Sequence, residues 1–403
     1  MSVLSYLEKL LNGVDIQWKT IGEVTLRTSN IKWREATRSY RYVDLTSVDI
    51  ETKKITETTE VTANNAPSRA QKLIEENDVI FATTRPTQQR FCLIDGEYSD
   101  EVASTGFCVL RAKQDEVLPK WIWHWISTSY FKKYVEENQS GSAYPAISDA
   151  KVKECYIPVP CPENPEKSLT IQAEIVRILD KFTALTAALT AALTAELTMR
   201  KKQYNYYLDQ LLSFDEGEVE WKMLGDLGEN LDSKRKPITS GLREAGSIPY
   251  YGASGIVDYV KDYIFDGDFL LISEDGANLL ARNTPIAFSI SGKSWVNNHA
   301  HVIKFDSYAE RRYVEYYLNS IDLAPYISGA AQPKLNKKNL ESIRIPNPSP
   351  EDKERIVSIL DKFDALTNSI NEGLPREIEL RQKQYEYYRD LLFSFPRPET
   401  ASN

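Results

Sequence analysis

The sequence predicts an α+β fold, in which two α/β domains are separated by two long helices that pair as an antiparallel coiled coil. Three observations lead to this prediction. Residues 175–214 are repeated without a gap at 356–395, with about half of the positions identical. A partial third copy lies at the N-terminus, and short β-prone runs fill the intervals between copies. Solenoid units are shorter, roughly 20 to 50 residues, so the repeat indicates one module used twice.

Both full copies have the apolar spacing of helices, which we expect over residues 168–214 and 350–395. Apolar residues recur at three- and four-residue steps, which places them on one face. The units TAAL, TAAL and TAEL fill residues 186–197 with helix formers, and their period of four should make the leucine stripe wind slowly. Gly373 and Pro375 predict a kink or break in the second copy.

The matching stripes favour two helices that pair and act as a spacer, over the alternative of two core helices that only pack. The side chains expected to pair them are Phe182, Leu185, Leu189, Leu193, Phe363 and Leu366. The N-terminal copy, residues 1–13, should be a helix tail, because Tyr6 and Trp18 match Tyr207 and Trp221. A repeat that is cut inside the helix predicts a pseudo-twofold, circular organisation, with this tail near the C-terminal helix.

The first domain is expected over residues 14–160. In chain order, the sequence predicts a strand at 78–83, a polar basic loop at 84–90, a strand at 91–94, an aromatic-rich helix from Trp121, the segment GSAYPAIS at 141–148 and a strand at 155–160.

The second domain is expected over residues 217–348, and the turn segment and strands of the first domain recur in it in the same order. GAAQPKLN (329–336) parallels GSAYPAIS, and strands at 268–273 and 344–348 parallel those of the first domain. The remaining sequence differs almost everywhere. A rigid scaffold with divergent loops carries specificity on the loops, so two related domains should bind two different targets.

Composition limits the class of protein. The net charge of −9 argues against a surface coated with positive charge, although local basic clusters remain available for DNA. No apolar run approaches roughly 18 residues, so we expect no membrane span and a cytoplasmic location. The N-terminus is too short and acidic for a secretory signal. The cysteines, Cys92, Cys108, Cys155 and Cys161, form no C-x-x-C pair, so free thiols are expected.

Motifs for catalysis are missing from the sequence. It contains no G-x-x-x-x-G-K-[ST] loop and no G-x-G-x-x-G after a strand. His299 and His301 would share one face of a strand, but no third ligand is evident, so a structural role is favoured and no metal is expected. With three histidines in total, acid–base catalysis has few candidates. We therefore interpret the chain as a binding subunit without catalytic residues.

These features resemble the specificity subunit of a type I restriction–modification enzyme (HsdS), over essentially the whole chain. The repeat at 186–197 is similar to the type IC subgroup, and residues 248–260 and 295–305 resemble framework segments of its target-recognition domains. The resemblance implies a bipartite, asymmetric DNA target with a fixed spacer. It also implies two methyltransferase (HsdM) and two restriction/translocase (HsdR) subunits as partners. S-adenosylmethionine, ATP and Mg would be used by those partners, with no cofactor on this chain.

Candidate DNA contacts are polar and basic side chains of the divergent loops, because Arg is bidentate to guanine and Gln or Asn to adenine. They are Arg85, Thr87, Gln88, Gln89 and Arg90 in the first domain, and Asn278, Arg282 and Asn283 in the second, where Lys293 is the candidate for a phosphate contact. A stand-alone two-domain DNA-binding regulator is the alternative. A self-sufficient restriction–methylation enzyme would need a methyltransferase motif that the sequence lacks, and a purely structural adaptor would leave the divergent loops unexplained.

Overall fold

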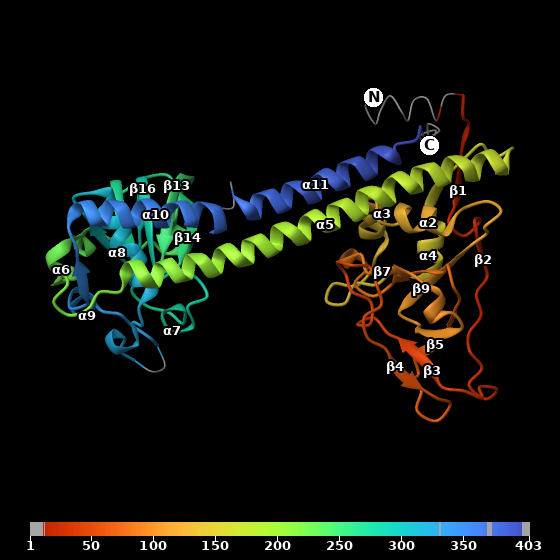
Figure 1. Ribbon diagram of the computed structural model, residues 1–403, viewed down its shortest axis with the longest axis horizontal. Helices are drawn as coiled ribbons and strands as arrows, with labels where there is room; N and C mark the ends of the chain where they lie inside the picture. The colour runs from red at the N-terminus through yellow and green to blue at the C-terminus, as the bar shows by residue number, and fades with distance from the viewer. Residues whose placement is uncertain (1–10, 12, 330–331, 369–372, 397–403) are drawn as a thin grey trace. The chain divides into compact units, whose positions relative to one another are not determined.

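The computed structural model describes residues 11, 13–329, 332–368 and 373–396, which form two compact units (Figure 1). The first unit contains the chain up to Ala192 together with the residues from Ile378 onward, and the second contains Leu193–Glu377. Helix α5 (Pro165–Leu212) continues from one unit into the other without interruption. The predicted helix tail at 1–13 lies outside the described residues except for Leu11 and Gly13.

The first domain consists of three small sheets and a group of short helices. Its strands are β1 (Ile16–Thr20), β2 (Thr25–Leu26), β3 (Tyr40–Val43), β4 (Thr59–Val61), β5 (Ala70–Ile74), β6 (Val79–Ala82), β7 (Phe91–Leu93), β8 (Glu101–Ser104), β9 (Phe107–Ala112) and β10 (Tyr156–Pro160). Its helices are η1 (Pro86–Gln88), η2 (Gly96–Tyr98), α2 (Pro119–Trp125), α3 (Ser129–Asn138) and α4 (Asp149–Glu154). The strand orders are β1-β10, β2-β9-β6-β7 and β4-β3-β8-β5.

The core of the first domain lies between the β6 sheet and helix α2. All four residues of β6 are buried, as expected for an unbroken apolar strand. Pro119 opens α2, where its fixed φ suits the first helical turn. Trp121 and Trp125 of this helix are fully buried, which confirms the aromatic-rich helix that the sequence predicts.

The second domain has one larger sheet. Its strands are β11 (Glu220–Met223), β12 (Glu229–Asn230), β13 (Ala245–Gly252), β14 (Gly255–Val260), β15 (Phe265–Ser273), β16 (Ala287–Val296), β17 (Ala300–Lys304) and β18 (Arg344–Asn347). Its helices are α6 (Leu224–Leu227), η3 (Asp232–Lys234), η4 (Ser240–Leu242), α7 (Asn278–Ala281), α8 (Tyr308–Ser320), η5 (Ala324–Tyr326) and α9 (Lys337–Glu341). The strand orders are β11-β18 and β12-β17-β15-β16-β13-β14.

A two-stranded antiparallel ladder joins the beginning and the end of each domain. In the first domain Trp18 of β1 lies opposite Pro158 of β10, and in the second Trp221 of β11 lies opposite Pro346 of β18. The two ladders therefore share one register. This agreement confirms that the framework of the domains is duplicated.

Each unit pairs the beginning of one helix copy with the end of the other. In the first unit Phe182 of α5 stacks on Tyr388 of α11 (Leu374–Leu392), with ring centroids 5.6 Å apart. In the second unit Phe363 of α10 (Pro350–Asn368) stacks on Tyr207 of α5 at 5.4 Å. These are the same two repeat positions with the copies exchanged, as a circular, pseudo-twofold organisation requires.

The predicted interruption of the second copy is confirmed. Helix α10 ends at Asn368 and α11 begins at Leu374, whereas the first copy is the single helix α5. Gly373 has a φ of +82°, and a Cβ there would lie 2.4 Å from the carbonyl oxygen of Ala365. Glycine is the residue that tolerates this conformation without a steric penalty.

The predicted leucine stripe needs correction around the four-residue repeats. Leu185 is 65% exposed and Leu189 is also exposed, whereas Thr183, Thr186 and Thr190 are partly buried. The Thr183 hydroxyl lies 2.9 Å from that of Tyr385. A period of four drifts roughly 40° per unit against a 3.6-residue turn. Leucines at that period therefore point away from the partner helix at the start of the repeat. They turn toward it at the end of the repeat, where Leu193 is partly buried.

Helix α5 also corrects the expectation that no segment could cross a membrane. By length and composition alone it is apolar enough to do so, and its most apolar window is not buried. The window consists of the alanine, threonine and leucine units, and each end of the helix pairs with a charged helix of the second copy. We interpret its apolar character as that of a spacer helix.

Candidate nucleic-acid interface

Two loops of the first domain are joined by main-chain hydrogen bonds and form its loop pair, residues 83–90 and 140–147. The amide of Arg85 donates to the carbonyl of Pro145 at 2.7 Å, and the amide of Ile147 donates to that of Thr83 at 2.9 Å. Ser140 and Ala146 exchange both of their main-chain bonds, at 2.9 Å each. Loops braced in this way hold their side chains in a fixed arrangement.

The second domain has an equivalent loop pair, residues 274–286 and, in the facing loop, 328–329 and 332–335. Gly276 donates to Pro333 at 3.2 Å, and Leu335 donates to Glu274 at 2.8 Å. Ser328 and Lys334 exchange main-chain bonds, as Ser140 and Ala146 do. The hydrogen bonds therefore match Arg85 with Gly276 and Pro145 with Pro333, although the side chains of the two loop pairs differ.

Three candidates of the first domain lie where a ligand could contact them. Arg85 and Gln88 are exposed, and Thr87 is partly exposed, all at or beside the short helix η1. Arg85 has a φ of 49° and ψ of 53°, in the left-handed region. These three side chains remain candidates for DNA contact.

Arg90 and Gln89 are held by the protein itself. The Arg90 guanidinium donates to the carbonyls of Leu45 and Val48 at 2.5 and 2.6 Å. Gln89 is partly buried with a φ of 53°, and its carbonyl accepts from Lys53. Burial lowers the pKa of Lys53 to about 8. We interpret these residues as supports of the loop, and their contact with DNA stays a prediction.

In the second domain Asn278 and Arg282 close the loop on itself. The Asn278 side chain exchanges two hydrogen bonds of 3.0 Å with the main chain of Thr284. Arg282 donates to the carbonyls of Asn319 and Ile321, at the end of α8. Asn283, between these contacts, is exposed.

The structure does not bring Lys293 to this loop. Lys293 pairs with Asp266 near one end of the β15–β16 ladder, whereas the loop leaves the ladder at Ile272 and Ala287. Six residues of strand separate the two places, roughly 20 Å at 3.3 Å per residue. Lys293 is exposed and lies 4.6 Å from the centre of the Tyr263 ring. The strand register places Lys293 away from the loop residues, and its contact with phosphate stays a prediction.

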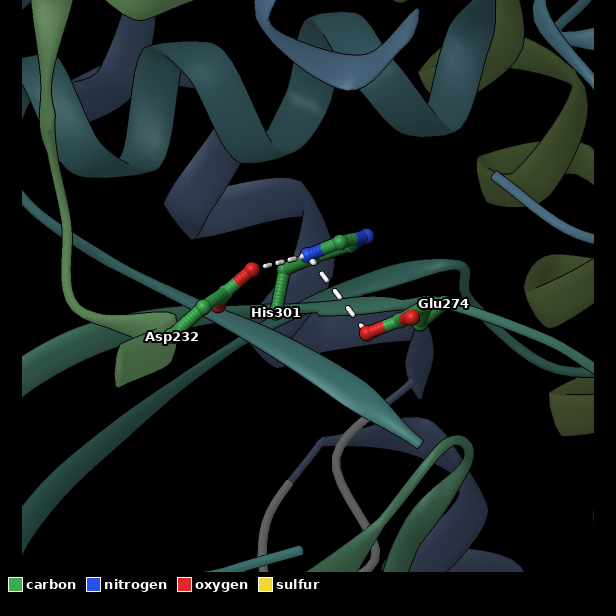
Figure 2. A group of neighbouring side chains, drawn as sticks. All are labelled: Asp232, Glu274 and His301. Atoms are coloured by element: carbon green, nitrogen blue, oxygen red, sulfur yellow. Dashed lines mark hydrogen bonds and ion pairs between the residues drawn. The ribbon is translucent and has the colours of Figure 1, made fainter. Parts of the chain in front are cut away.

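Beside the second loop pair lies a charge cluster, defined by Asp232, Arg235, Glu274, His301 and Lys334, in which all the side chains except Lys334 are largely buried. Figure 2 shows the His301 ring between the carboxylates of Asp232 and Glu274, with Nδ1 2.6 Å from Asp232 Oδ2. His301 Nε2 lies 2.7 Å from the carbonyl oxygen of Leu335 and must donate to it. Arg235 and Lys334 contact Glu274 at 2.6 and 3.1 Å.

This cluster has the ligand types of a metal site but the hydrogen bonding of an ion-pair network. Burial alone would raise the pKa of Asp232, but the hydrogen bond and charge of His301 lower it. Burial likewise opposes ionisation of Glu274, and Arg235 and Lys334 lower its pKa. Nδ1 of His301 faces the Asp232 carboxylate and Nε2 faces the carbonyl of Leu335, so both ring nitrogens are engaged within the network. The cluster fixes the loop to β17.

The two predicted paired histidines have separate roles. His301 lies in β17 and is buried, whereas His299 precedes the strand, is exposed, and has Nδ1 2.9 Å from Asp275. They therefore do not share a strand face.

Burial raises the pKa of the Cys92 and Cys108 thiols to about 12, which leaves these thiols protonated and unreactive at neutral pH.

One repeated aspartate attaches each domain to a helix of the frame. Asp180 of α5 lies 2.9 Å from Nε2 of His124, and it accepts from Lys120 at 2.5 Å. At the same repeat position, Asp361 of α10 accepts from Arg312 at 2.9 Å and from the hydroxyl of Tyr316 at 2.6 Å. The loop pairs are therefore carried by domains that are fixed to the spacer helices.

Sequence reasoning missed Tyr144, which is 71% exposed in the second loop of the first pair. Its ring centre lies 5.3 Å from the guanidinium carbon of Arg85. The signal was available, because Tyr144 precedes Pro145 in the segment that the second domain repeats as Gln332 and Pro333. The segment was interpreted as a framework alone, although the repeat retains the proline and changes the residue before it.

Two duplicated domains with divergent loop pairs, mounted on pairing helices, define a modular two-target recognition protein. The model of the type I restriction modification DNA specificity domain matches residues 15–199 and again 216–380. The chain belongs to this family. It is 40% identical, over the full length of both chains, to the type I restriction enzyme EcoR124I/EcoR124II specificity subunit of Escherichia coli.

Two solved structures share the fold. A chain from a study of complex assembly in the type I R-M system has a TM-score of 0.69 and 22% identity, and the match covers 94% of this chain and 97% of that one. The HsdS subunit from Thermoanaerobacter tengcongensis has a TM-score of 0.57 and 23% identity, and covers 94% and 96%. These likenesses agree with the predicted α+β architecture and its helical linker.

Proposed function

We propose that the chain is the DNA specificity subunit of a type I restriction–modification complex. Its two domains bind two short, unlike half-sites, and the helices set the length of the unread spacer between them. The observation that carries this proposal is the pair of loop scaffolds, which share their main-chain hydrogen bonds but differ in side chains. A shared loop framework that carries two different sets of side chains suits a protein that binds an asymmetric bipartite sequence.

The proposal assigns chemistry to partners. Two methyltransferase subunits would use S-adenosylmethionine to methylate adenine, and two restriction subunits would use ATP and Mg to translocate and cut. This chain would supply no catalytic group, and the complex would work in the cytoplasm. The acidic net charge of −9 supports a division in which partners provide part of the DNA-binding surface.

The decisive experiment is co-expression of this chain with a type I methyltransferase subunit, followed by sequencing of methylated adenines. The expected result is one bipartite motif with a gap of constant length. Methylation without a bipartite motif would contradict the proposal. Tight, sequence-specific binding by the purified chain without partners would instead favour a stand-alone DNA-binding regulator.

The spacer role predicts the effect of removing one four-residue unit, residues 190–193. One unit is roughly 6 Å of helix, against about 3.4 Å per base pair along a strand. The gap in the methylated motif should shorten by one or two base pairs, and both half-sites should stay the same. A deletion that changes the bases recognised would remove the spacer role. The exposed substitution Leu185→Ala, which leaves the helix length unchanged, is the matched control.

A further inference from the structure

The most informative difference between the loop pairs lies at one backbone position. Arg85 and Gly276 occupy it, since each amide donates to the carbonyl of the proline in the facing loop. Both residues have positive φ, 49° for Arg85 and 105° for Gly276. Glycine adopts this region without a steric penalty, whereas a residue with a Cβ is strained there.

The second domain shows that the loop can be built with glycine at this position. A Cβ at Gly276 would meet no atom within 4 Å, so crowding is not what distinguishes the two domains. The first domain nevertheless carries an arginine, at a cost in backbone strain. Such strain concentrates where a side chain has a task in binding or catalysis.

The Arg85 side chain does nothing for the fold that glycine could not replace. Arg85 is exposed, and its guanidinium carbon lies within cation–π distance of the exposed ring of Tyr144. Within the described ranges, no carboxylate lies within ion-pair distance of it and no carbonyl accepts from it, in contrast to Arg90 and Arg282. All five of its N–H donors are therefore available to a ligand.

We propose that Arg85 and Tyr144 form a guanine-reading pair in the first domain. The inference rests on the proposed function, and it names the base class and the residues that read it. The planar guanidinium donates to O6 and N7 of guanine in the major groove. Tyr144 lies at cation–π distance from that group, and the main-chain bond from Arg85 to Pro145 fixes the loop, so little freedom is lost on binding.

The test uses the complex with the methyltransferase subunit and compares Arg85→Gly, Arg85→Lys and Tyr144→Ala. Arg85→Gly copies the second domain, so its melting temperature should equal or exceed that of the parent. Competition binding then compares the target duplex with duplexes in which each guanine of the first half-site is replaced. The parent complex should bind one replaced duplex about 10- to 100-fold more weakly. Arg85→Gly should lose that discrimination alone.

The other variants separate base reading from charge. Arg85→Lys keeps the charge without the bidentate fork, so it should bind the target but discriminate that guanine poorly. Tyr144→Ala should weaken the discrimination less than Arg85→Gly does, and Tyr144→Phe should retain it. Gln332→Ala, at the position of Tyr144 in the second domain, should leave the first half-site unchanged and serves as control.

Several outcomes would overturn the inference. A bipartite motif whose first half-site contains no guanine overturns it while leaving the proposed function intact. So does Arg85→Gly discrimination equal to the parent, or an Arg85→Lys complex that restores every preference, since the side chain would then contact phosphate. Arg85→Gly binding that is lost for all sequences at an unchanged melting temperature counts against it in the same way. A parent complex without any bipartite motif overturns the proposed function, and the inference with it.

Discussion

The two attachments between domain and frame differ in their donors and agree in their acceptor. Asp180 is bound by His124 and Lys120, and Asp361 by Arg312 and Tyr316, together with the hydroxyl of Tyr308 at 2.8 Å. A carboxylate accepts from any donor that reaches it, so the frame can keep one residue while each domain changes its own. The donor residues of the duplicated domains can therefore change while each domain keeps its position on the frame.

The largest expected loss of stability comes from removing the aspartate that attaches the second domain. Asp361→Ala removes a carboxylate that the guanidinium of Arg312, which is 13% exposed, shares with the hydroxyls of Tyr316 and Tyr308, and leaves Glu315 as the remaining close carboxylate. Removing one partner of a buried ion pair should lower the free energy of unfolding by about 3 kcal/mol. Urea denaturation measures the loss, and hydrogen exchange should locate it in α8. The control is Asp364→Ala, whose 3.4 Å contact with Arg312 is exposed and should contribute under about 1 kcal/mol.

The aromatic stacks sharpen the comparison because here the two units use identical residues. Phe182→Ala and Phe363→Ala each remove a half-buried ring from a tyrosine of the other copy. Each should lower the free energy of unfolding by about 2 kcal/mol, from burial and ring contact together. Denaturation of the two single variants, side by side, tests the equivalence. Losses that differ by more than a factor of two would contradict the exchanged-copy organisation.

A smaller effect is expected from Asp180→Ala. Lys120 is 48% exposed and can be solvated, and His124 loses a hydrogen bond without leaving a buried charge. The unfolding free energy should fall by about 1 kcal/mol, with faster hydrogen exchange in α2. The comparison itself would fail if this loss equalled that of Asp361→Ala.

The smallest effect is a pH dependence confined to the first domain. Burial lowers the pKa of His124, although Asp180 opposes the shift. The unfolded chain then binds a proton that the folded chain does not, so this stability is complete above the ordinary histidine pKa of about 6.5. It is lost as the pH falls toward the lower folded value. Melting temperatures between pH 7.5 and 5 should fall less in His124→Gln, which keeps a donor but cannot titrate. An unchanged slope would remove His124 as the cause.

Sequence reasoning was most successful where the repeat could be compared with itself. Aligning 175–214 with 356–395 predicted the helices, their pairing and the interruption at Gly373, since each follows from local periodicity and backbone preference. It could not find the donors to Asp180 and Asp361. Those come from domain helices that differ between the copies and become neighbours only on folding.

The candidate site was predictable by segment but not by residue. The divergent loops were identified, yet Arg90 and Arg282 proved to hold main-chain carbonyls, as surface arginines near strand ends can. The hairpin register places Lys293, the predicted phosphate contact, away from the loop, and sequence distance does not reveal such a register. Tyr144 was missed although the repeated segment indicated it, and the hydrogen bonds then matched its loop to that of the second domain.

The first domain's core is completed by the far end of the polypeptide. Trp121 packs on Phe393 with ring centres 4.7 Å apart, and the indole of Trp18 donates to the carbonyl of Pro396 at 2.9 Å. During synthesis on the ribosome, this domain emerges early but meets its last hydrophobic partners only after the second domain has been translated. A chain that ended before Ile378 would thus keep an uncovered Trp121 in its first domain, a ready substrate for chaperones and proteases.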